Sequence, residues 1–246
     1  MRTSEHVYAR RGELALELTV VEPDGEALER RFGVVLFHGG AWIGGGKGHL
    51  LPQAKAIASA GGVTFLPEYR LLDRDHASER TELSVATDVS ACVDDAKAAI
   101  RWARDHAGDF CVDPDRIAIG GGSAGGHLAV TAALCGQRVD AAGLVLLNPV
   151  LDLTNWPSAG PPKVRHAYSP IEHVDTMSPV LILQEDADTV TPPDVVRSFA
   201  EMCRAVETPC KVVLYPGVGH GFFNRSPHLE QTNAEIARFL DALFVS

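Results

Sequence analysis

The stretch from Arg116 to Ala129 constrains the fold of this chain more than any other. It passes from a short apolar run through a cluster of glycines into a second apolar segment, which is typical of a buried strand turning sharply into a helix. Within the turn, Gly121-Gly122-Ser123-Ala124-Gly125 fits the G-x-S-x-G pattern. In this pattern the small flanking residues let the chain crowd around a serine held in an exposed, strained position. Ser123 is therefore the first candidate functional residue.

The same glycines allow two other interpretations. Gly120, Gly122 and Gly125 also satisfy the dinucleotide-binding pattern G-x-G-x-x-G, which requires an acidic residue at the end of the next strand. The acid at about the right distance, Asp140, precedes the next apolar run at 144–147 instead of following it. The other interpretation is a purely structural glycine turn. Motifs in the rest of the chain are therefore needed to distinguish the three interpretations.

Composition limits the class of protein. A chain of 246 residues with 46% hydrophobic and 22% charged residues is expected to form a single α/β domain over 1–246. Its 32 acidic and 22 basic residues give a formal charge of −10 with no basic run, so we expect no nucleic-acid partner. Neither a signal peptide in residues 1–11 nor an apolar run of about 20 residues is found, which predicts a cytoplasmic protein without membrane binding. Five cysteines without C-x-x-C spacing argue against a disulfide framework and a zinc site, and we expect no metal or cofactor.

The residues before Ser123 predict alternating strands and helices. Alternating polarity at 13–21 predicts a half-exposed strand that pairs with 6–9 as an antiparallel edge. Continuous apolar runs and helical spacing predict buried strands at 33–37 and 63–66 and helices at about 50–60 and 84–106. The longer helix leaves charged residues for solvent: Asp94, Asp95, Lys97, Arg101 and Arg104. A charged loop is expected at 73–82, and a turn at Asp113-Pro114-Asp115.

The residues after Ser123 continue the alternation. Strands are expected at 144–147, 180–183 and 211–215, and helices at 124–134, about 193–206 and the C-terminus. Residues 151–178 are proline-rich and predict a lid-like excursion with at most short helices. Together these patterns predict an α/β fold, with a mostly parallel central sheet of about eight strands, helices on both faces and no large cap domain.

Four groups follow expected strands in an order that suggests acyl-transfer chemistry. A serine hydroxyl is a poor nucleophile at neutral pH, so such chemistry needs a histidine base, an acid that orients it, and donors for the developing oxyanion. His38-Gly39-Gly40 and Ser123 follow two central strands, whereas Asp188 and His220 follow two later ones. The carboxyl ends of parallel strands share one edge of the sheet, where open α/β sheets hold their sites.

With these motifs, the chain over about 30–245 resembles the α/β-hydrolases, and most of all the acetylesterase-type carboxylesterases related to the hormone-sensitive-lipase group. The motifs are His38-Gly39-Gly40-Ala41-Trp42, Tyr69-Arg70-Leu71, Gly121–Gly126 and Gly219-His220-Gly221-Phe222. The resemblance implies that Ser123 is the nucleophile, His220 the base and Asp188 the acid. It also implies that backbone N–H groups of Gly39 or Gly40 and of Ala124 form the oxyanion hole.

Some assignments stay open at this point. The acid loop of the family usually begins His-Gly, but Gln184-Glu185 stands here, so Asp186 and Glu185 remain alternatives to Asp188. The other interpretation of Asp186 and Glu185 is solvated loop charge. Four aromatic residues are either walls of an acyl pocket or core residues: Trp42, Trp156, Phe222 and Phe223. His38 is expected to brace the oxyanion loop, and most of the other histidines are expected on the surface.

The resemblance implies a metal-independent serine carboxylesterase that hydrolyses short-chain, acetyl-type esters through an acyl-enzyme intermediate. Because only a short cover is expected, we predict small soluble ester substrates rather than long-chain lipids. One alternative is an amide or formamide hydrolase of the kynurenine-formamidase type, which shares the motifs. Another is a non-catalytic ligand-binding member of the fold, in which the histidine is typically lost but which here retains His220. The oligomeric state is left open, with a homodimer as one candidate.

Overall fold

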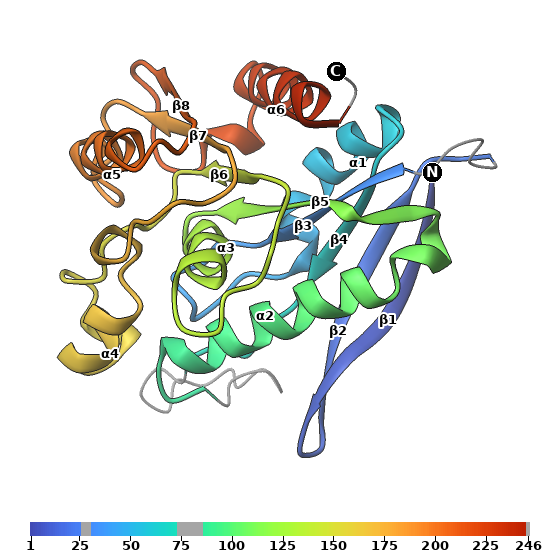
Figure 1. The fold of residues 1–246 in the computed structure, drawn as a ribbon, viewed down its shortest axis with the longest axis horizontal. Coiled ribbons are helices and arrows are strands. Elements are labelled where there is room, and N and C mark those ends of the chain that lie inside the picture. Colours follow the sequence, from blue (N-terminus) through green and yellow to red (C-terminus); the bar gives the residue numbers. More distant parts are fainter. Residues whose placement is uncertain (26–30, 73–85, 245–246) are drawn as a thin grey trace.

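A single eight-stranded sheet forms the centre of the protein in the computed structural model, which describes residues 1–25, 31–72 and 86–244 (Figure 1). The strands are β1 (Arg2–Arg11), β2 (Leu14–Glu22), β3 (Arg31–Phe37), β4 (Val63–Pro67), β5 (Val112–Gly122), β6 (Leu144–Leu147), β7 (Val180–Glu185) and β8 (Cys210–Tyr215). Their order is β1-β2-β4-β3-β5-β6-β7-β8. The β1–β2 and β2–β4 pairs are antiparallel and the other pairs are parallel, which confirms the predicted class.

Helices cover both faces of this sheet. The helices are α1 (Leu51–Ser59), α2 (Val89–Asp105), α3 (Ala124–Leu134), α4 (Pro162–Ala167), α5 (Pro193–Ala205) and α6 (His228–Phe244). The apolar side chains of α2, α3 and α5 belong to one core, and those of α1 and α6 belong to a second core on the opposite face (Figure 1). No helix within the described ranges combines the length and apolar character that a membrane span requires.

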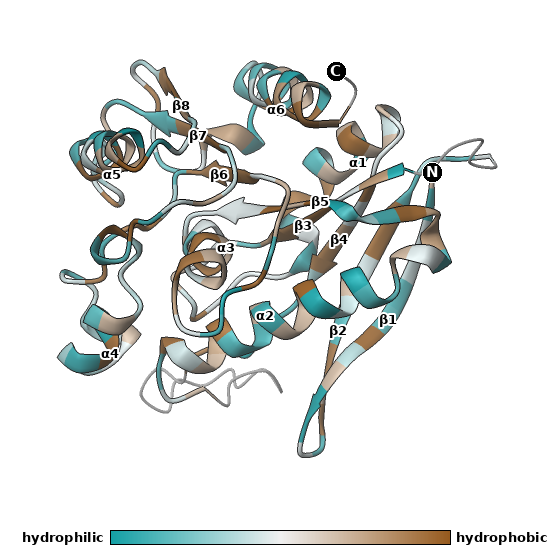
Figure 2. Ribbon diagram, viewed as in Figure 1, coloured by the Kyte–Doolittle hydropathy of each residue, from teal (hydrophilic) through white to brown (hydrophobic). Residues whose placement is uncertain are grey.

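The central strands are apolar on both sides because each strand contributes to both cores. In β3, Val35 and Phe37 pack in the core with α2, whereas Val34 and Leu36 pack in the core with α1. Successive side chains of a strand point to opposite faces, so a strand buried between two helical layers needs an uninterrupted apolar run. Figure 2 shows brown on β4, β6 and the buried helix α3, a pale glycine end on β5, and teal mostly on the outer helices and loops.

Two element boundaries differ from the sequence-based predictions. The Asp113-Pro114-Asp115 segment is not a turn before the strand but an irregularity within β5, because Arg31 pairs with Val112 and Gly33 with Ile117. Proline has no N–H to donate to the ladder, and a bulge tolerates it. The long helix α2 begins at Val89 instead of 84, and the Asp88 side chain caps it by accepting the Ser90 N–H at 2.9 Å. The loop predicted at 73–82 lies outside the described residues.

The segment between β6 and β7 contains only short helical pieces among its described residues, as its prolines predict. These are 3-10 turns at Pro157–Ala159 and Pro170–Glu172 on either side of α4. Proline removes a backbone donor and disfavours helix in the residue before it, which keeps each piece short.

Two charged residues of α2 that were predicted to face solvent are buried. The Asp95 side chain is 0% exposed and accepts hydrogen bonds from Arg70 Nε at 2.7 Å and Arg11 Nε at 2.9 Å. Lys97 is also buried, and its Nζ donates to the Cys135 carbonyl at 2.8 Å. The prediction was wrong because helical periodicity does not reveal partners on neighbouring elements.

The buried Asp95 ion pair should contribute strongly to stability. Removing one partner of a buried pair leaves the other charge uncompensated, and typically costs about 3–5 kcal/mol. We expect Asp95→Ala to lower the free energy of unfolding in urea by that amount. The matched control is Asp94→Ala, since Asp94 is the exposed neighbour on the same helix and should change it by less than about 0.5 kcal/mol. Equal effects of the two substitutions would contradict this account.

Candidate active site

Ser123 lies at the sharp turn between β5 and α3. Its φ of 52° and ψ of −116° are unusual for a residue other than glycine. The turn brings β3, β5 and α3 so close that a Cβ at Gly125 would lie 2.0 Å from the Phe37 carbonyl oxygen, and one at Gly121 would lie 2.4 Å from it. The Ser123 N–H donates to the Leu147 carbonyl at 2.8 Å, which ties the turn to β6. The glycines are therefore required by close packing.

The predicted oxyanion residues lie beside Ser123, where the strand order reverses between β3 and β5. Gly39 and Gly40 follow β3, and together with Ser123 they line one cavity. Gly40 has a φ of 121°, and its carbonyl accepts the N–H groups of Ile43 and Gly44. Ala124 is the first residue of α3, so its N–H has no partner within the helix and lies at the positive end of the helix dipole.

His220 connects Ser123 to a carboxylate. The distance from Ser123 Oγ to His220 Nε2 is 3.0 Å, and the distance from His220 Nδ1 to Asp188 Oδ2 is 2.8 Å. Asp188 follows β7 and His220 follows β8, so three segments far apart in the sequence meet at one edge of the sheet. With its proton on Nδ1, facing Asp188, the imidazole leaves Nε2 free to accept the Ser123 proton.

Asp188 is buried and held in its charged form by hydrogen-bond donors. Its Oδ1 accepts the Val190 N–H at 2.7 Å and the Thr191 N–H at 2.9 Å, and its Oδ2 accepts the Asn148 amide at 3.2 Å and the Thr191 hydroxyl. Burial alone would raise the pKa of Asp188, but the hydrogen bonds, of which the one from His220 is the largest, hold that pKa well below its usual range.

Asn148 is a functional candidate that the sequence reasoning missed. It is fully buried at the carboxyl end of β6, and its Nδ2 donates to both Asp188 and Glu185. Its position directly after a predicted strand was the one signal that could have indicated it, since Ser123, Asp188 and His220 also follow strands.

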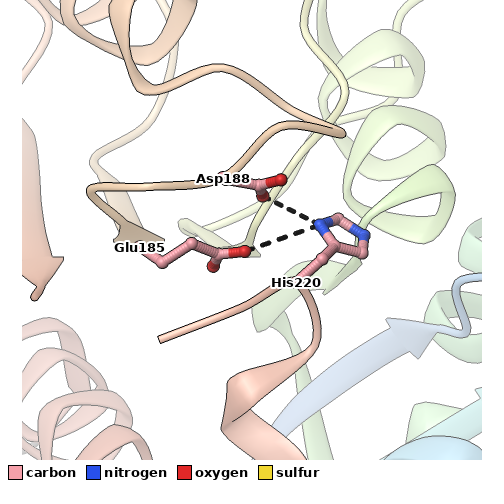
Figure 3. Close-up of side chains that lie close together, drawn as sticks. All are labelled: Glu185, Asp188 and His220. Carbon is pink, nitrogen blue, oxygen red and sulfur yellow. Dashed lines mark hydrogen bonds and ion pairs between the residues drawn. The ribbon is translucent and has the colours of Figure 1, made fainter. Parts of the chain in front are cut away.

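Glu185 is not the solvated loop charge that the sequence suggests as its alternative role. It is the last residue of β7, its side chain is 0% exposed, and its Oε1 lies 3.7 Å from His220 Nδ1 (Figure 3). Burial, together with the hydrogen bond to Asp188 and the charge of Asp188, raises the pKa of Glu185 to about 8. Asp186 is exposed and accepts the Gly217 N–H at 3.0 Å, so Asp188 is the acid nearest to His220.

These three residues could also be considered as cation ligands. The ligand atoms of Glu185, Asp188 and His220 lie within 4.8 Å of one another. However, the Asp188 oxygens already accept N–H and O–H donors, whose hydrogens point at the carboxylate. This donor set fits a hydrogen-bonded histidine better than a cation, and we assign no metal ligand here.

A cavity of about 250 Å³ opens in front of Ser123. Its lining comes from the segment between β3 and α1, the serine turn, the 151–178 segment and the loops after β7 and β8: Gly39, Gly40, Ala41, His49, Leu50, Gly122, Ser123, Trp156, Val190, His220, Gly221, Phe223 and Asn224. Of the four aromatic candidates, Trp156 and Phe223 line the cavity. Trp42 and Phe222 do not line it, and both are buried.

Trp42 and Phe222 pack in the core against other aromatic side chains. Trp42 is 0% exposed and packs edge-on against Trp156 with 5.3 Å between ring centroids. Phe222 packs against Tyr215 at 4.6 Å and is the first residue of a 3-10 turn after His220. Both therefore have the core role that the sequence left as their alternative.

His38 and His127 are both buried, and of the two, His38 lies where the sequence analysis expects it. His38 stacks on Tyr69 at 4.3 Å, and its carbonyl accepts the Tyr69 hydroxyl at 3.0 Å, so it sits where a brace for the oxyanion loop is expected. His127 is an exception to the expectation that most of the other histidines lie on the surface, because nearly all of α3 is buried and the His127 Nε2 meets the Tyr168 carbonyl at 2.8 Å. Burial lowers the pKa of each histidine to about 4, so both are neutral.

An eight-stranded, mostly parallel sheet with a serine at its central turn and a histidine and carboxylate on later loops defines an α/β-hydrolase. The sequence matches the BD-FAE family over residues 21–155, more than half of the chain, and a second family, described as TAP-like protein, over 143–242. The chain belongs to the BD-FAE family. The predicted resemblance to α/β-hydrolase esterases is confirmed.

Relatives and solved structures agree with this family. The probable carboxylic ester hydrolase LipM of Mycobacterium tuberculosis is 29% identical over 225 residues, which is 76% of this chain and 49% of LipM. Carboxylesterase NlhH of the same organism is 35% identical over 113 residues, 46% of this chain and 32% of NlhH. The chain thus spans about half or less of these relatives. Native esterase 2 of Thermogutta terrifontis has a TM-score of 0.85 at 29% identity, covering 98% of this chain and 92% of that one.

Proposed function

We propose that this protein is a serine carboxylic ester hydrolase that acts on small, short-chain acyl esters. The observation that carries the proposal is the hydrogen-bonded series from Ser123 Oγ to His220 Nε2 at 3.0 Å and from His220 Nδ1 to Asp188 at 2.8 Å. It opens on a cavity that the two oxyanion glycines also line. Such a series activates a serine for attack on an acyl carbonyl.

In the proposed reaction, Ser123 Oγ attacks the ester carbonyl while its proton passes to His220 Nε2. Asp188 stays ionised and stabilises the imidazolium that forms. The oxyanion accepts hydrogen bonds from the backbone N–H groups of Gly39 or Gly40 and of Ala124. His220 then returns the proton to the leaving alcohol, which leaves an acyl group on Ser123. Water, deprotonated by His220, attacks this acyl-enzyme and releases the acid and the free serine.

Structures of the Thermogutta terrifontis esterase support the nature of the substrate. That enzyme has been described with butyrate bound and with propionate bound, at 29% and 30% identity to this chain. It has also been described as phosphorylated by paraoxon and phosphonylated by sarin. Organophosphorus modification is the chemistry expected of an activated serine, and short carboxylates are the acyl products of short-chain esters.

The cavity size favours short acyl groups. Pockets for drug-sized ligands usually measure about 300–1,000 Å³, and the cavity at Ser123 is smaller, at about 250 Å³. Trp156 and Val190 line it and also line a second cavity of about 20 Å³. Trp156 and Val190 therefore stand between the two spaces, and Trp156, as the larger side chain, is the better placed to limit acyl length.

We expect kcat/KM for p-nitrophenyl esters to peak at acetyl to butyryl and to fall for longer chains. Each additional buried CH₂ would add about 0.8 kcal/mol to binding, but only where space exists to bury it. Trp156→Ala should shift the optimum to longer chains by joining the two cavities. The matched control is Trp102→Ala, because Trp102 of α2 stacks on His106 and is not among the residues that line the cavity.

Two results would contradict this proposal. A wild-type optimum at octanoyl or beyond would exclude the short-chain preference. Faster hydrolysis of N-formylkynurenine than of every ester, including an acetylated sugar, would replace ester hydrolysis by formamide hydrolysis.

A further inference from the structure

Two carboxyl groups, rather than one, face the Nδ1 atom of His220. Asp188 Oδ2 lies 2.8 Å from it and Glu185 Oε1 lies 3.7 Å from it (Figure 3). Both side chains are 0% exposed. The Oε2 atom of Glu185 accepts the Asn148 amide, whereas no N–H or hydroxyl group among the described residues donates to its Oε1 atom. Burial of a second carboxyl group beside Asp188 is costly, so its place beside His220 requires a functional explanation.

We propose that Glu185 is a positioning residue for His220, a reserve carboxyl group that takes over the Nδ1 proton when Asp188 does not hold it. This inference rests on the proposed esterase function. The required movement is small, because the Glu185 to Nδ1 distance of 3.7 Å needs to shorten by about 1 Å to equal the 2.8 Å of the Asp188 contact.

The charges around Glu185 explain why it is a reserve in the native protein. The titratable side chains that face it are Asp188 and His220, and Tyr215 is its partner residue on the adjacent strand β8. Two adjacent carboxylates cannot both ionise easily, and Asp188, with more donors, keeps the charge. Burial remains when Asp188 is removed, but the hydrogen bond and the charge that raise the pKa of Glu185 are lost. The pKa of Glu185 then falls, so that Glu185 can ionise beside the imidazole.

Two different substitutions of Asp188 distinguish an active site that has a reserve carboxyl group from a triad that has none. Asparagine keeps the space filled and offers an amide to Nδ1, which favours the wrong imidazole tautomer and costs about 10⁴-fold in a comparable triad. Alanine removes the side chain and gives Glu185 access to Nδ1. In a chain without a reserve carboxyl group, alanine should be no better than asparagine.

The test compares kcat/KM for p-nitrophenyl acetate between pH 5 and 10 in variants of the 246-residue chain. We expect Asp188→Ala to lose about tenfold to a hundredfold, and Asp188→Asn to lose at least ten times more than that. Adding Glu185→Gln to Asp188→Ala should remove a further factor of about a hundred, together with the acidic limb that Glu185 gives to the pH profile. Adding Asp186→Asn instead should change nothing further, since its amide oxygen can still accept the Gly217 N–H.

The outcomes distinguish this proposal from the esterase function itself. If Asp188→Ala is as inactive as Asp188→Asn, or if Glu185→Gln has no effect in the Asp188→Ala background, Glu185 is not a reserve. If Glu185→Gln alone costs more than Asp188→Asn, Glu185 is the primary acid. Wild-type protein without esterase activity would instead refute the proposed function. Should Asp188→Ala fail to fold by circular dichroism, Asp188→Ser replaces it, because a serine hydroxyl can accept the Thr191 N–H that Asp188 now accepts.

Discussion

Ser123→Ala and His220→Ala should each lower kcat for a short-chain ester by about 10⁶-fold, and the double variant should be little worse than either single one. The two side chains are expected to act as a unit, since His220 Nε2 lies 3.0 Å from Ser123 Oγ and is placed to accept its proton. Removal of either one leaves the oxyanion donors and substrate binding as the remaining sources of rate enhancement. The measurement is steady-state hydrolysis of p-nitrophenyl acetate by the three variants.

Circular dichroism and thermal unfolding of the same variants form the control. Ser123 lies at a strained turn and His220 is partly exposed, so neither substitution should reduce the melting temperature enough to explain lost activity. If the two losses multiply in the double variant, Ser123 and His220 do not function in one step.

Asp188→Asn should lower kcat by about a thousandfold or more, because the amide no longer holds the imidazole in the tautomer that frees Nε2. Asp188 makes the 2.8 Å contact to His220 Nδ1. Asp186→Asn is the matched control two residues away. Asp186 is exposed and bonds to the Gly217 N–H, so its substitution should alter kcat by less than about twofold.

If Asp186→Asn lowered kcat and Asp188→Asn did not, Asp186 rather than Asp188 would be the acid that holds His220. Loss of activity in both variants would instead indicate that the charge of Asp186 contributes to holding the histidine loop. Urea unfolding of Asp186→Asn separates these cases, because a loop role would also reduce stability.

The architecture could be predicted from the sequence because each central strand must bury both of its faces. The runs at 33–37, 144–147 and 180–183 are apolar throughout and fall within β3, β6 and β7. The turn at Ser123 could be predicted because close approach of three elements leaves room for glycine alone at Gly121 and Gly125. Since carboxyl ends of parallel strands meet at one edge, the sequence also predicts that Ser123, Asp188 and His220 lie near one another, while their roles remain predictions.

The buried charges could not be predicted, because their burial depends on contacts between distant segments. Asp95 follows Asp94 in the sequence, yet one faces solvent and the other pairs with Arg70 from the loop after β4. Glu185 begins a visibly acidic stretch, but β7 continues through it, and pairing with Tyr215 of β8 keeps it inside. Arg70 and Tyr215 both lie far from these acids in the sequence, so a local sequence pattern cannot reveal the contacts.

The sequence could not predict which aromatic side chains reach the cavity, for a similar reason. Trp42 and Trp156 touch each other edge-on, but only Trp156 reaches the cavity. Both stand in loops after strands, and side-chain direction in a loop depends on backbone angles. Trp42 has a φ of 61°, a left-handed conformation that nothing in its residue type predicts.

The most direct test of the account is to find which residue reacts with an organophosphonate probe. Ser123 combines a strained turn with a hydrogen bond to His220, so intact-protein mass spectrometry should show one adduct. Peptide mapping should locate it on Ser123, and Ser123→Ala should remain unlabelled under the same conditions. Labelling of a different serine, or esterase activity that is undiminished in Ser123→Ala, would contradict the account.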